Sequence, residues 1–238
     1  MLVVDQVSKS FGGVRAATDV SLTLPGGAVR CVVGPNGAGK STFLSMLSGH
    51  TRPDSGTIRF HDRDITGWPV HRVARAGIVR KFQRPSFYPE LSVAENLLVP
   101  VLATGARRRR ARAAVEEVAG QVGLTDALGA PAAHLPHGRT QWLEIGMLVA
   151  RRAEVLLLDE PTAGMTADET SGTSALIARL VADHGVAAIV IEHDMAFVRS
   201  LDCPVTVLHL GRVIAEGPMS AVEADEQVRA VYLGEEHS

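Results

Sequence analysis

The chain has 238 residues, 46% of them hydrophobic and only 4% aromatic, so its core must rest on aliphatic side chains. This usage favours an α/β protein with buried parallel strands. The formal net charge of −2 gives no basic field of the kind that attracts nucleic acid, so no nucleic-acid partner is expected. No apolar stretch is long enough to cross a bilayer and no secretory signal is visible, so a membrane role would come through a partner chain.

Apolar periodicity and turn residues predict the elements in chain order. The expected strands lie at 2–4, 20–24, 29–33, 57–60, 155–158, 187–191, 205–210 and 212–215. The expected helices lie at 40–48, 93–101, 107–122, 140–151, 167–184 and 220–233. Helical periods thus dominate the middle of the chain, and strands dominate its two ends.

This distribution predicts a single domain over 1–238. An α/β core is expected from 1–83 and 151–238, with a mostly parallel sheet and an antiparallel β part near its beginning. The stretch 84–150 is expected to be an inserted helical part.

The two cysteines, Cys31 and Cys203, stand beside apolar residues and show no CxxC spacing. Such residues are more typical of buried reduced thiols than of a disulfide or a metal site. We therefore expect both thiols to be buried and reduced.

A basic run, Arg107–Arg110 with Arg112, precedes Glu116 and Glu117 on an expected helix. Pairs between neighbouring helical turns on a solvated face explain this pattern. Contact with anionic lipid headgroups is the alternative.

A glycine-rich loop joins the strand at 29–33 to the following helix. It reads Gly34-Pro35-Asn36-Gly37-Ala38-Gly39-Lys40-Ser41-Thr42 and matches the phosphate-loop pattern G-x-x-x-x-G-K-[ST]. Its glycines let backbone N–H groups point at phosphate oxygens, and the helix N-terminus adds a favourable dipole. Lys40 would supply a positive charge to the β and γ phosphates, and Ser41 can hold Mg²⁺.

Two carboxylates end the apolar strand at 155–158. Asp159 would lie near the phosphate loop and coordinate Mg²⁺, while Glu160 could polarise an attacking water. An exposed acidic turn is the alternative, and the presence of the phosphate loop favours the catalytic interpretation.

Three further residues are candidates by position. His193 follows the strand at 187–191 and could donate a hydrogen bond to a γ-phosphate, although a lone histidine there can equally be structural. Gln83, at the edge of the helical stretch, can contact Mg²⁺ or water without adding charge. Phe11 could stack on an adenine ring, or pack on the core as a strand aromatic.

These pieces, in this order, resemble the nucleotide-binding subunit of an ABC transporter over essentially the whole chain. The resemblance implies the P-loop NTPase fold of ABC ATPases, with ATP and Mg²⁺ as cofactors. It implies that residues 34–42 are the Walker A loop and that the Walker B strand ends at Asp159. It implies that Glu160 is the catalytic glutamate and that His193 is the switch histidine. Gln83 would be the Q-loop residue that contacts the metal, and Phe11 would stack on adenine.

The LSGGQ signature of this family, which closes over ATP held by a second ATPase subunit, aligns with Leu135-Pro136-His137-Gly138-Arg139. Pro136 stands where the family has serine, so a hydroxyl and a backbone N–H are both lost. The D-loop carries Thr166 where many members have aspartate. Since the altered signature would act only on the partner's ATP, a related but non-identical partner ATPase with an unequal site is expected.

Finer stretches narrow the resemblance. Residues 77–83 and 91–96 resemble the branched-chain amino acid and amide uptake proteins, and 141–148, 163–166 and 191–199 look most like urea-transport ATP-binding subunits. Uptake of urea or an amide is therefore implied, with branched-chain amino acids as the alternative. The implied partners are two transmembrane permease subunits and, indirectly, an extracytoplasmic solute-binding protein, with this chain in the cytoplasm on the inner face of the membrane.

Other classes explain only part of the pattern. A soluble ABC ATPase acting on ribosomes usually has two ATPase domains, and one acting on DNA inserts long coiled coils that are not visible here. A P-loop kinase or GTPase would not require Gln83, the signature-like segment and His193 together. A regulatory module without turnover would have no need of Glu160. The sequence therefore predicts an ATPase.

Overall fold

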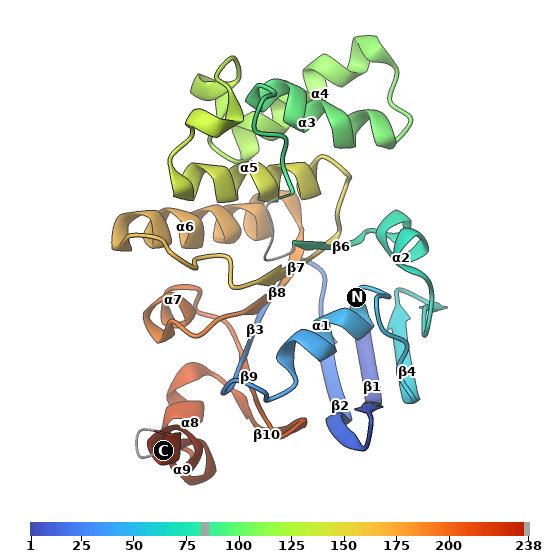
Figure 1. Cartoon of the computed structure of the whole chain (residues 1–238), viewed down its shortest axis with the longest axis vertical. Coiled ribbons are helices and arrows are strands. Elements are labelled where there is room, and N and C mark those ends of the chain that lie inside the picture. The colour runs from blue at the N-terminus through green and yellow to red at the C-terminus, as the bar shows by residue number, and fades with distance from the viewer. Residues whose placement is uncertain (82–85, 236–238) are drawn as a thin grey trace.

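Two sheets organise the part of the chain that the structure, a computed structural model, describes, namely residues 1–81 and 86–235 (Figure 1). The strands are β1 (Leu2–Phe11), β2 (Val14–Leu24), β3 (Val29–Val33), β4 (Ser55–Phe60), β5 (Arg63–Asp64), β6 (Ile78–Lys81), β7 (Val155–Asp159), β8 (Ala187–Ile191), β9 (Val205–His209) and β10 (Arg212–Gly217). The α-helices are α1 (Lys40–Leu47), α2 (Val70–Ala76), α3 (Val93–Ala103), α4 (Arg108–Gln121), α5 (His137–Val149), α6 (Ala167–His184), α7 (Met195–Ser200), α8 (Met219–Ala224) and α9 (Glu226–Glu235).

The central sheet has the strand order β10-β9-β3-β8-β7-β6. Its pairs are parallel except for the β9–β10 hairpin, so the carboxyl ends of β3, β6, β7 and β8 meet at one edge. Every residue of β7 and β8 is buried. Leu156 and Leu158 face one hydrophobic cluster and Leu157 faces the other, which explains the continuous apolar runs.

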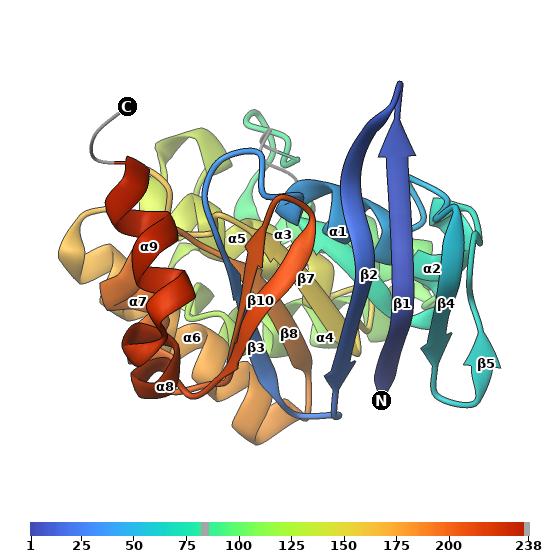
Figure 2. The same ribbon diagram turned by 90° about the horizontal axis from the view of Figure 1, so that it is seen from below.

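The second sheet, β2-β1-β4-β5, is antiparallel. Helix α1 contributes Phe43, Leu44 and Leu47 to a cluster that also holds Leu2 from β1 and Ile189 from β8. The helix that follows the phosphate loop is therefore fixed between the two sheets, as Figure 2 shows from below.

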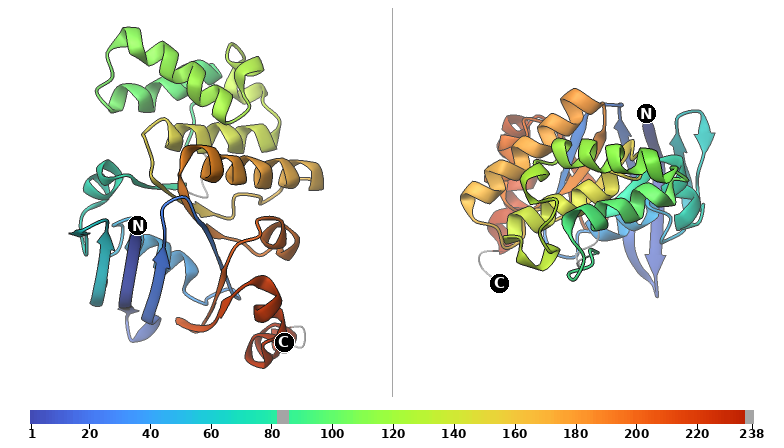
Figure 3. Two further views of the ribbon diagram at one scale, coloured as in Figure 1. Left: turned by 180° about the vertical axis from the view of Figure 1, so that it is seen from behind. Right: turned by 90° about the horizontal axis from the view of Figure 1, so that it is seen from above.

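Helices α3, α4 and α5 gather at one end of the molecule, and α6 lies between them and the sheet (Figures 1 and 3). Leu97, Leu143 and Leu176, one from each of α3, α5 and α6, belong to the same buried cluster. The architecture confirms the predicted α/β fold with a mostly parallel sheet, an antiparallel sheet and inserted helices.

Some element boundaries differ from the sequence prediction. Elements β5, α2, β6 and α7, of only 2, 7, 4 and 6 residues, were not predicted because each is too short to show a clear period. The expected tail helix is two helices, because the Asp225 carboxylate accepts the N–H groups of Gln227 and Val228 at 2.9 and 3.0 Å and starts a new one.

Arg112, at the end of the basic run, lies on a solvated part of α4. Arg112 Nε lies 3.3 Å from Glu116 Oε1, one turn along the helix, and both side chains are exposed. This pair confirms the predicted intrahelical pairing at that position. Within the described ranges, no helix has both the length and the apolar character needed to span a bilayer.

Candidate active site

The phosphate loop needs glycine at two places where the backbone runs close to its neighbours. Gly34 and Gly39 have φ values of 148° and 100°, and a Cβ on either would lie 2.1 Å from a carbonyl oxygen, of Leu208 and Ala16 respectively. No other residue fits there. Gly39 is the N-cap of α1 and has no side chain, so the capping residue itself binds none of the first N–H groups of that helix.

Lys40, the first residue of α1, is buried at the centre of the loop. Its Nζ donates hydrogen bonds to the carbonyl oxygens of Gly34 at 2.5 Å and Pro35 at 2.8 Å. Ser41 and Asn36 are exposed beside it, whereas Ala38 is buried. The loop therefore holds a positive charge next to the open helix N-terminus, where a phosphate would bind.

Asp159 ends β7 and is 97% buried, with only 3% of its side chain exposed. Its Oδ2 accepts a hydrogen bond from Arg80 Nη2 at 2.7 Å, and Arg80 also donates to Ser45 at 2.8 Å. The buried Oδ1 has no hydrogen-bond partner among residues 1–81 and 86–235. An oxygen left in this way fits a hard cation such as Mg²⁺. Gln83, the other predicted metal contact, lies outside the described residues.

Glu160 and His193, predicted separately, lie together at the carboxyl edge of the sheet. His193 Nε2 is 3.0 Å from Glu160 Oε1, and the side chains are 41% and 33% exposed, so water reaches both. Glu160 has a φ of 48°, an uncommon backbone conformation for a residue with a side chain, and its N–H donates to Ile191 at 2.9 Å.

Glu192 was not assigned a role from the sequence, yet it organises this edge. The side chain is buried and accepts hydrogen bonds from Thr162 Oγ1 at 2.6 Å, Thr162 N–H at 3.0 Å and its neighbour His193 N–H at 3.0 Å. It therefore links the end of β8 to the segment after Glu160. The sequence signal that could have indicated Glu192 is its position, directly after the apolar strand β8 and directly before His193.

Phe11 ends β1 and is 50% exposed. Lys9 Nζ lies 5.4 Å from the centre of its ring. The alternative in which this aromatic packs on the core is wrong, because half of the residue faces solvent. Its role in adenine stacking stays a prediction.

The signature-like segment runs into a helix earlier than expected. Helix α5 begins at His137 rather than at Thr140, and Pro136 is its N-cap, with no side-chain oxygen to bind the first N–H groups. Glu169 of α6 supplies that oxygen: its Oε1 accepts the Gly138 N–H at 2.9 Å. A carboxylate from the next helix thus takes the place of a capping side chain.

Glu169 also takes part in the capping of its own helix, α6. Its Oε2 accepts hydrogen bonds from the N–H and hydroxyl of Thr166, both at 3.0 Å, in a capping box. The Thr166 N–H and then the Gly138 N–H hold the pKa of Glu169 below its ordinary value, so the carboxylate stays ionised. Thr166 is the N-cap of α6, and it stands at the D-loop position where many members of the resembled family have aspartate.

The rest of the signature-like segment contacts its own chain. Arg139 forms an ion pair with Asp126, its Nη1 lying 3.0 Å from Oδ2. His137 Nε2 lies 3.0 Å from the carbonyl oxygen of Ala163. Leu135 is half-buried against the helical cluster. The charge of Arg139 is therefore already engaged within the chain.

A buried ion pair connects α5 to the sheet. Lys81 Nζ at the end of β6 lies 3.3 Å from Glu144 Oε2, and no more than 4% of either side chain is exposed. Glu144 Oε1 also accepts hydrogen bonds from Ser86, from its N–H at 2.6 Å and its hydroxyl at 3.1 Å. Residues on both sides of 82–85 are thus fastened to the helix that carries the signature-like segment.

Comparison with known proteins gives a consistent result. A family model described as ABC transporter matches residues 17–163, and one described as branched-chain amino acid ATP-binding cassette transporter matches residues 212–238. The chain is 36% identical over 250 residues to the high-affinity branched-chain amino acid transport ATP-binding protein BraF of Pseudomonas aeruginosa, with 99% of the chain and 98% of BraF covered.

Two more relatives extend the comparison. LivG of Escherichia coli, another high-affinity branched-chain amino acid transport ATP-binding protein, is 34% identical, with 99% of the chain and 98% of LivG covered. The solved ADP conformation of MJ1267, an ATP-binding cassette of an ABC transporter, superimposes with a TM-score of 0.88 at 28% identity, covering 98% of each chain.

Proposed function

The chain belongs to the ABC transporter family, in its branched-chain amino acid transport group of ATP-binding subunits, and we propose that its cargo is a branched-chain amino acid. It is an ATPase whose hydrolysis of ATP is coupled to transport. The names of the relatives and the match over residues 212–238 support this cargo. Urea, the cargo first implied by resemblance, has no support among these relatives, so the alternative is preferred.

The Glu160–His193 contact is the observation that carries the proposed chemistry. Glu160 accepts the proton of a water that attacks the γ-phosphate, and His193 donates a hydrogen bond to that phosphate. Lys40 neutralises phosphate charge from within the loop.

Mg²⁺ is proposed as the metal that accompanies ATP. Asp159 would hold it, with Ser41 and Gln83 as further ligands, because Asp159 presents a buried oxygen without a partner in the described residues. The metal would neutralise charge on the β and γ phosphates. Arg80 keeps the Asp159 carboxylate in place through their 2.7 Å hydrogen bond.

The partners follow from the incomplete site. The segment 135–139 is proposed to act on ATP held by a second, related but non-identical ATPase subunit, whose own signature completes the site of this chain. The pair is proposed to lie on the cytoplasmic face of the membrane and to drive two permease subunits. A solute-binding protein outside the membrane would deliver the cargo to them.

Transport in proteoliposomes tests the cargo. The chain would be reconstituted with its partner ATPase, permeases and binding protein, and ATP hydrolysis measured with leucine or urea outside. Leucine is expected to stimulate hydrolysis and to accumulate inside, and a Glu160→Gln chain should abolish accumulation. Stimulation and accumulation by urea alone would overturn the proposed cargo while leaving the ATPase assignment intact.

A further inference from the structure

The two cysteines, far apart in sequence, meet in the fold. Cys31 lies on β3 and Cys203 on the segment that enters β9, and their Sγ atoms are 3.4 Å apart in a hydrogen bond. Parallel pairing of the two strands brings them together, and the Cys31 N–H donates to Pro204 at 3.1 Å. Both thiols are free. A disulfide has an S–S length of about 2.05 Å, so the two sulfur atoms would have to approach by about 1.4 Å to form a covalent bond.

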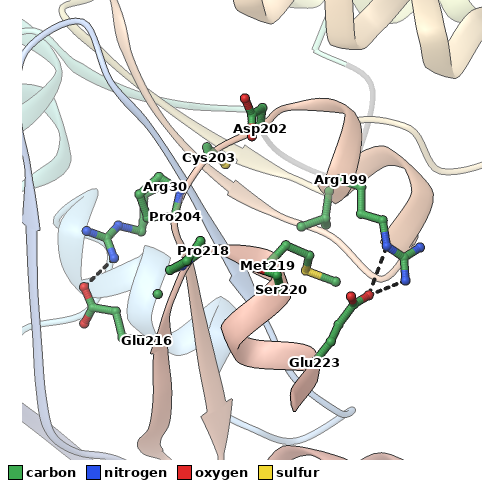
Figure 4. Close-up of a pocket in the computed structure, with 12 residues that line it drawn as sticks. Arg30, Arg199, Asp202, Cys203, Pro204, Glu216, Pro218, Met219, Ser220 and Glu223 are labelled. Atoms are coloured by element: carbon green, nitrogen blue, oxygen red, sulfur yellow. Dashed lines mark hydrogen bonds and ion pairs between the residues drawn. The ribbon is translucent and has the colours of Figure 1, made fainter. Parts of the chain in front are cut away.

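Only one of the two thiols can meet a small molecule from solvent. Cys203 is half-buried and lines a pocket of about 690 Å³ whose wall includes Pro204, Pro218 and Met219 (Figure 4). Cys31 is 0% exposed, directly behind it. The expectation that both cysteines are buried is therefore correct for Cys31 and wrong for Cys203.

Ion pairs flank this pocket on two sides. Arg30 pairs with Glu216 and Arg199 pairs with Glu223, as the dashed lines in Figure 4 show. With Asp202 also in the lining, two positive and three negative side chains border the pocket, so it does not favour an anion. A small neutral molecule is therefore the kind of reagent that can enter this pocket and reach Cys203.

The environment gives the two thiols different reactivity. The hydrogen bond with Cys31 lowers the pKa of Cys203, with a smaller contribution from the charge of Arg30 and against the opposing effect of burial. The same hydrogen bond, together with burial, raises the pKa of Cys31 well above its ordinary value. Cys203 therefore ionises first, and the thiolate is the form that reacts with oxidants.

We propose that Cys203 and Cys31 form a reversible oxidation site in which a small peroxide in the pocket converts the two thiols into a disulfide. The Cys203 thiolate attacks one peroxide oxygen, the O–O bond breaks, and the product is a sulfenic acid with hydroxide as leaving group. That hydroxide takes up the proton that Cys203 lost on ionising and becomes the first water. Cys31 sulfur then attacks Cys203 sulfur, the S–O bond breaks, and the hydroxide released from the sulfenic acid takes the proton of Cys31 and becomes the second water. Two thiols give two electrons, and one molecule of hydrogen peroxide becomes two of water.

The bond would connect strands that already pair. Because β3 and β9 are hydrogen-bonded neighbours, the strand that leads into Gly34 keeps its position, and ATP affinity is expected to stay unchanged. The closed loop runs from residue 31 to residue 203, so the unfolded chain loses much freedom. The melting temperature is expected to rise by at least about 5 °C on oxidation.

Peptide mapping of the purified full-length chain tests the site. After hydrogen peroxide and alkylation of remaining thiols, mass spectrometry should find a peptide pair joining Cys31 to Cys203 within one chain, lost on treatment with dithiothreitol. In Cys31→Ser the reaction should stop at the sulfenic acid, which dimedone traps on Cys203. In Cys203→Ser, Cys31 should stay unmodified by peroxide in the folded protein.

The melting temperature of each reduced variant shows that it folds, and alanine replaces serine where it does not. The proposal is overturned if both thiols stay reduced at peroxide levels that oxidise glutathione, or if oxidation joins two chains through Cys203. Dimedone labelling of Cys203 in the wild-type chain without any disulfide would also overturn it, because Cys31 would then not act as the second thiol.

Discussion

The phosphate loop and the signature-like segment each lead into the N-terminus of a helix, but the groups beside the first N–H groups differ between the two helices. At α1 the N-cap is Gly39, which has no side chain to bind the first N–H groups, and the charge of Lys40 lies beside them. At α5 the N-cap is Pro136, and the Gly138 N–H already binds the ionised carboxylate of Glu169. A helix N-terminus binds an anion only when its N–H groups are available.

The difference separates two duties of the same chain. Among the groups proposed to hold and hydrolyse its own ATP, Glu160 and His193 lie 3.0 Å apart, whereas Gln83 lies outside the described residues. The groups that would close over a partner's ATP are reduced by Pro136 and occupied by Glu169. Two unequal ATP sites in a heterodimer are the expected consequence. A substitution in either set of groups should therefore affect mainly one of the two ATP sites.

The largest effect is expected on the hydrolytic side, from Glu160→Gln. The amide cannot accept the proton of water, so phosphate release from ATP bound by this chain should fall by about 10³-fold, within the range that general bases supply. ATP binding should persist. Glu154→Gln, an exposed glutamate that pairs with His61, is the matched control and should leave turnover unchanged. Wild-type hydrolysis by Glu160→Gln would show that another group is the base.

Lys40→Ala tests the phosphate loop. Removing a buried charge at the proposed phosphate site should weaken ATP binding by about 100-fold, as loss of charge-assisted hydrogen bonds would. Isothermal titration calorimetry measures this directly. Arg63→Ala, an exposed cation on β5, is the control and should bind ATP normally. Equal affinities of the Lys40→Ala and wild-type chains would remove Lys40 from the site.

Glu169→Ala is expected to have the smallest effect, and on the signature side. It frees the Gly138 N–H for a partner's γ-phosphate, so turnover of the partner's ATP should rise about threefold, less than the roughly tenfold that a full hydrogen bond to a charged group can supply. It also removes a capping box, at a cost of about 1 kcal/mol.

The chain offers a matched control for that variant. Glu95 forms the same capping box with Ser92 at the start of α3, with a distance of 2.8 Å from Ser92 N–H to Glu95. Glu95→Ala should cost similar stability in urea unfolding and leave turnover of the partner's ATP unchanged. Similar turnover in both variants would mean that Glu169 does not restrain the signature-like segment.

Sequence patterns predicted the regular parts of the fold better than its contacts. The bounds 29–33, 167–184 and 187–191 agree with β3, α6 and β8, because apolar periodicity is clear over these stretches. The predicted start of α5, Thr140, lies three residues after its observed start, His137. Proline is compatible with a helix N-terminus, so the helix can begin directly after Pro136.

The contacts that decide the chemistry join residues far apart in the chain. Gly138 and Glu169 are 31 positions apart, and Cys31 and Cys203 are 172 apart. Nothing in either local pattern indicates its partner, since the pairing of helices or strands creates the contact. For the same reason Arg80 was not expected beside Asp159, 79 positions away.

ATPase measurements on the reconstituted heterodimer, with the catalytic glutamate of each subunit disabled in turn, show whether its two ATP sites are unequal. With Glu160→Gln in this chain, only the partner's ATP turns over, and Pro136→Ser should raise that rate by about tenfold, as one restored hydrogen bond to phosphate of about 1.5 kcal/mol would. With the partner's glutamate disabled, Pro136→Ser should change nothing. Equal rates at the two sites, unmoved by Pro136→Ser, would contradict the account.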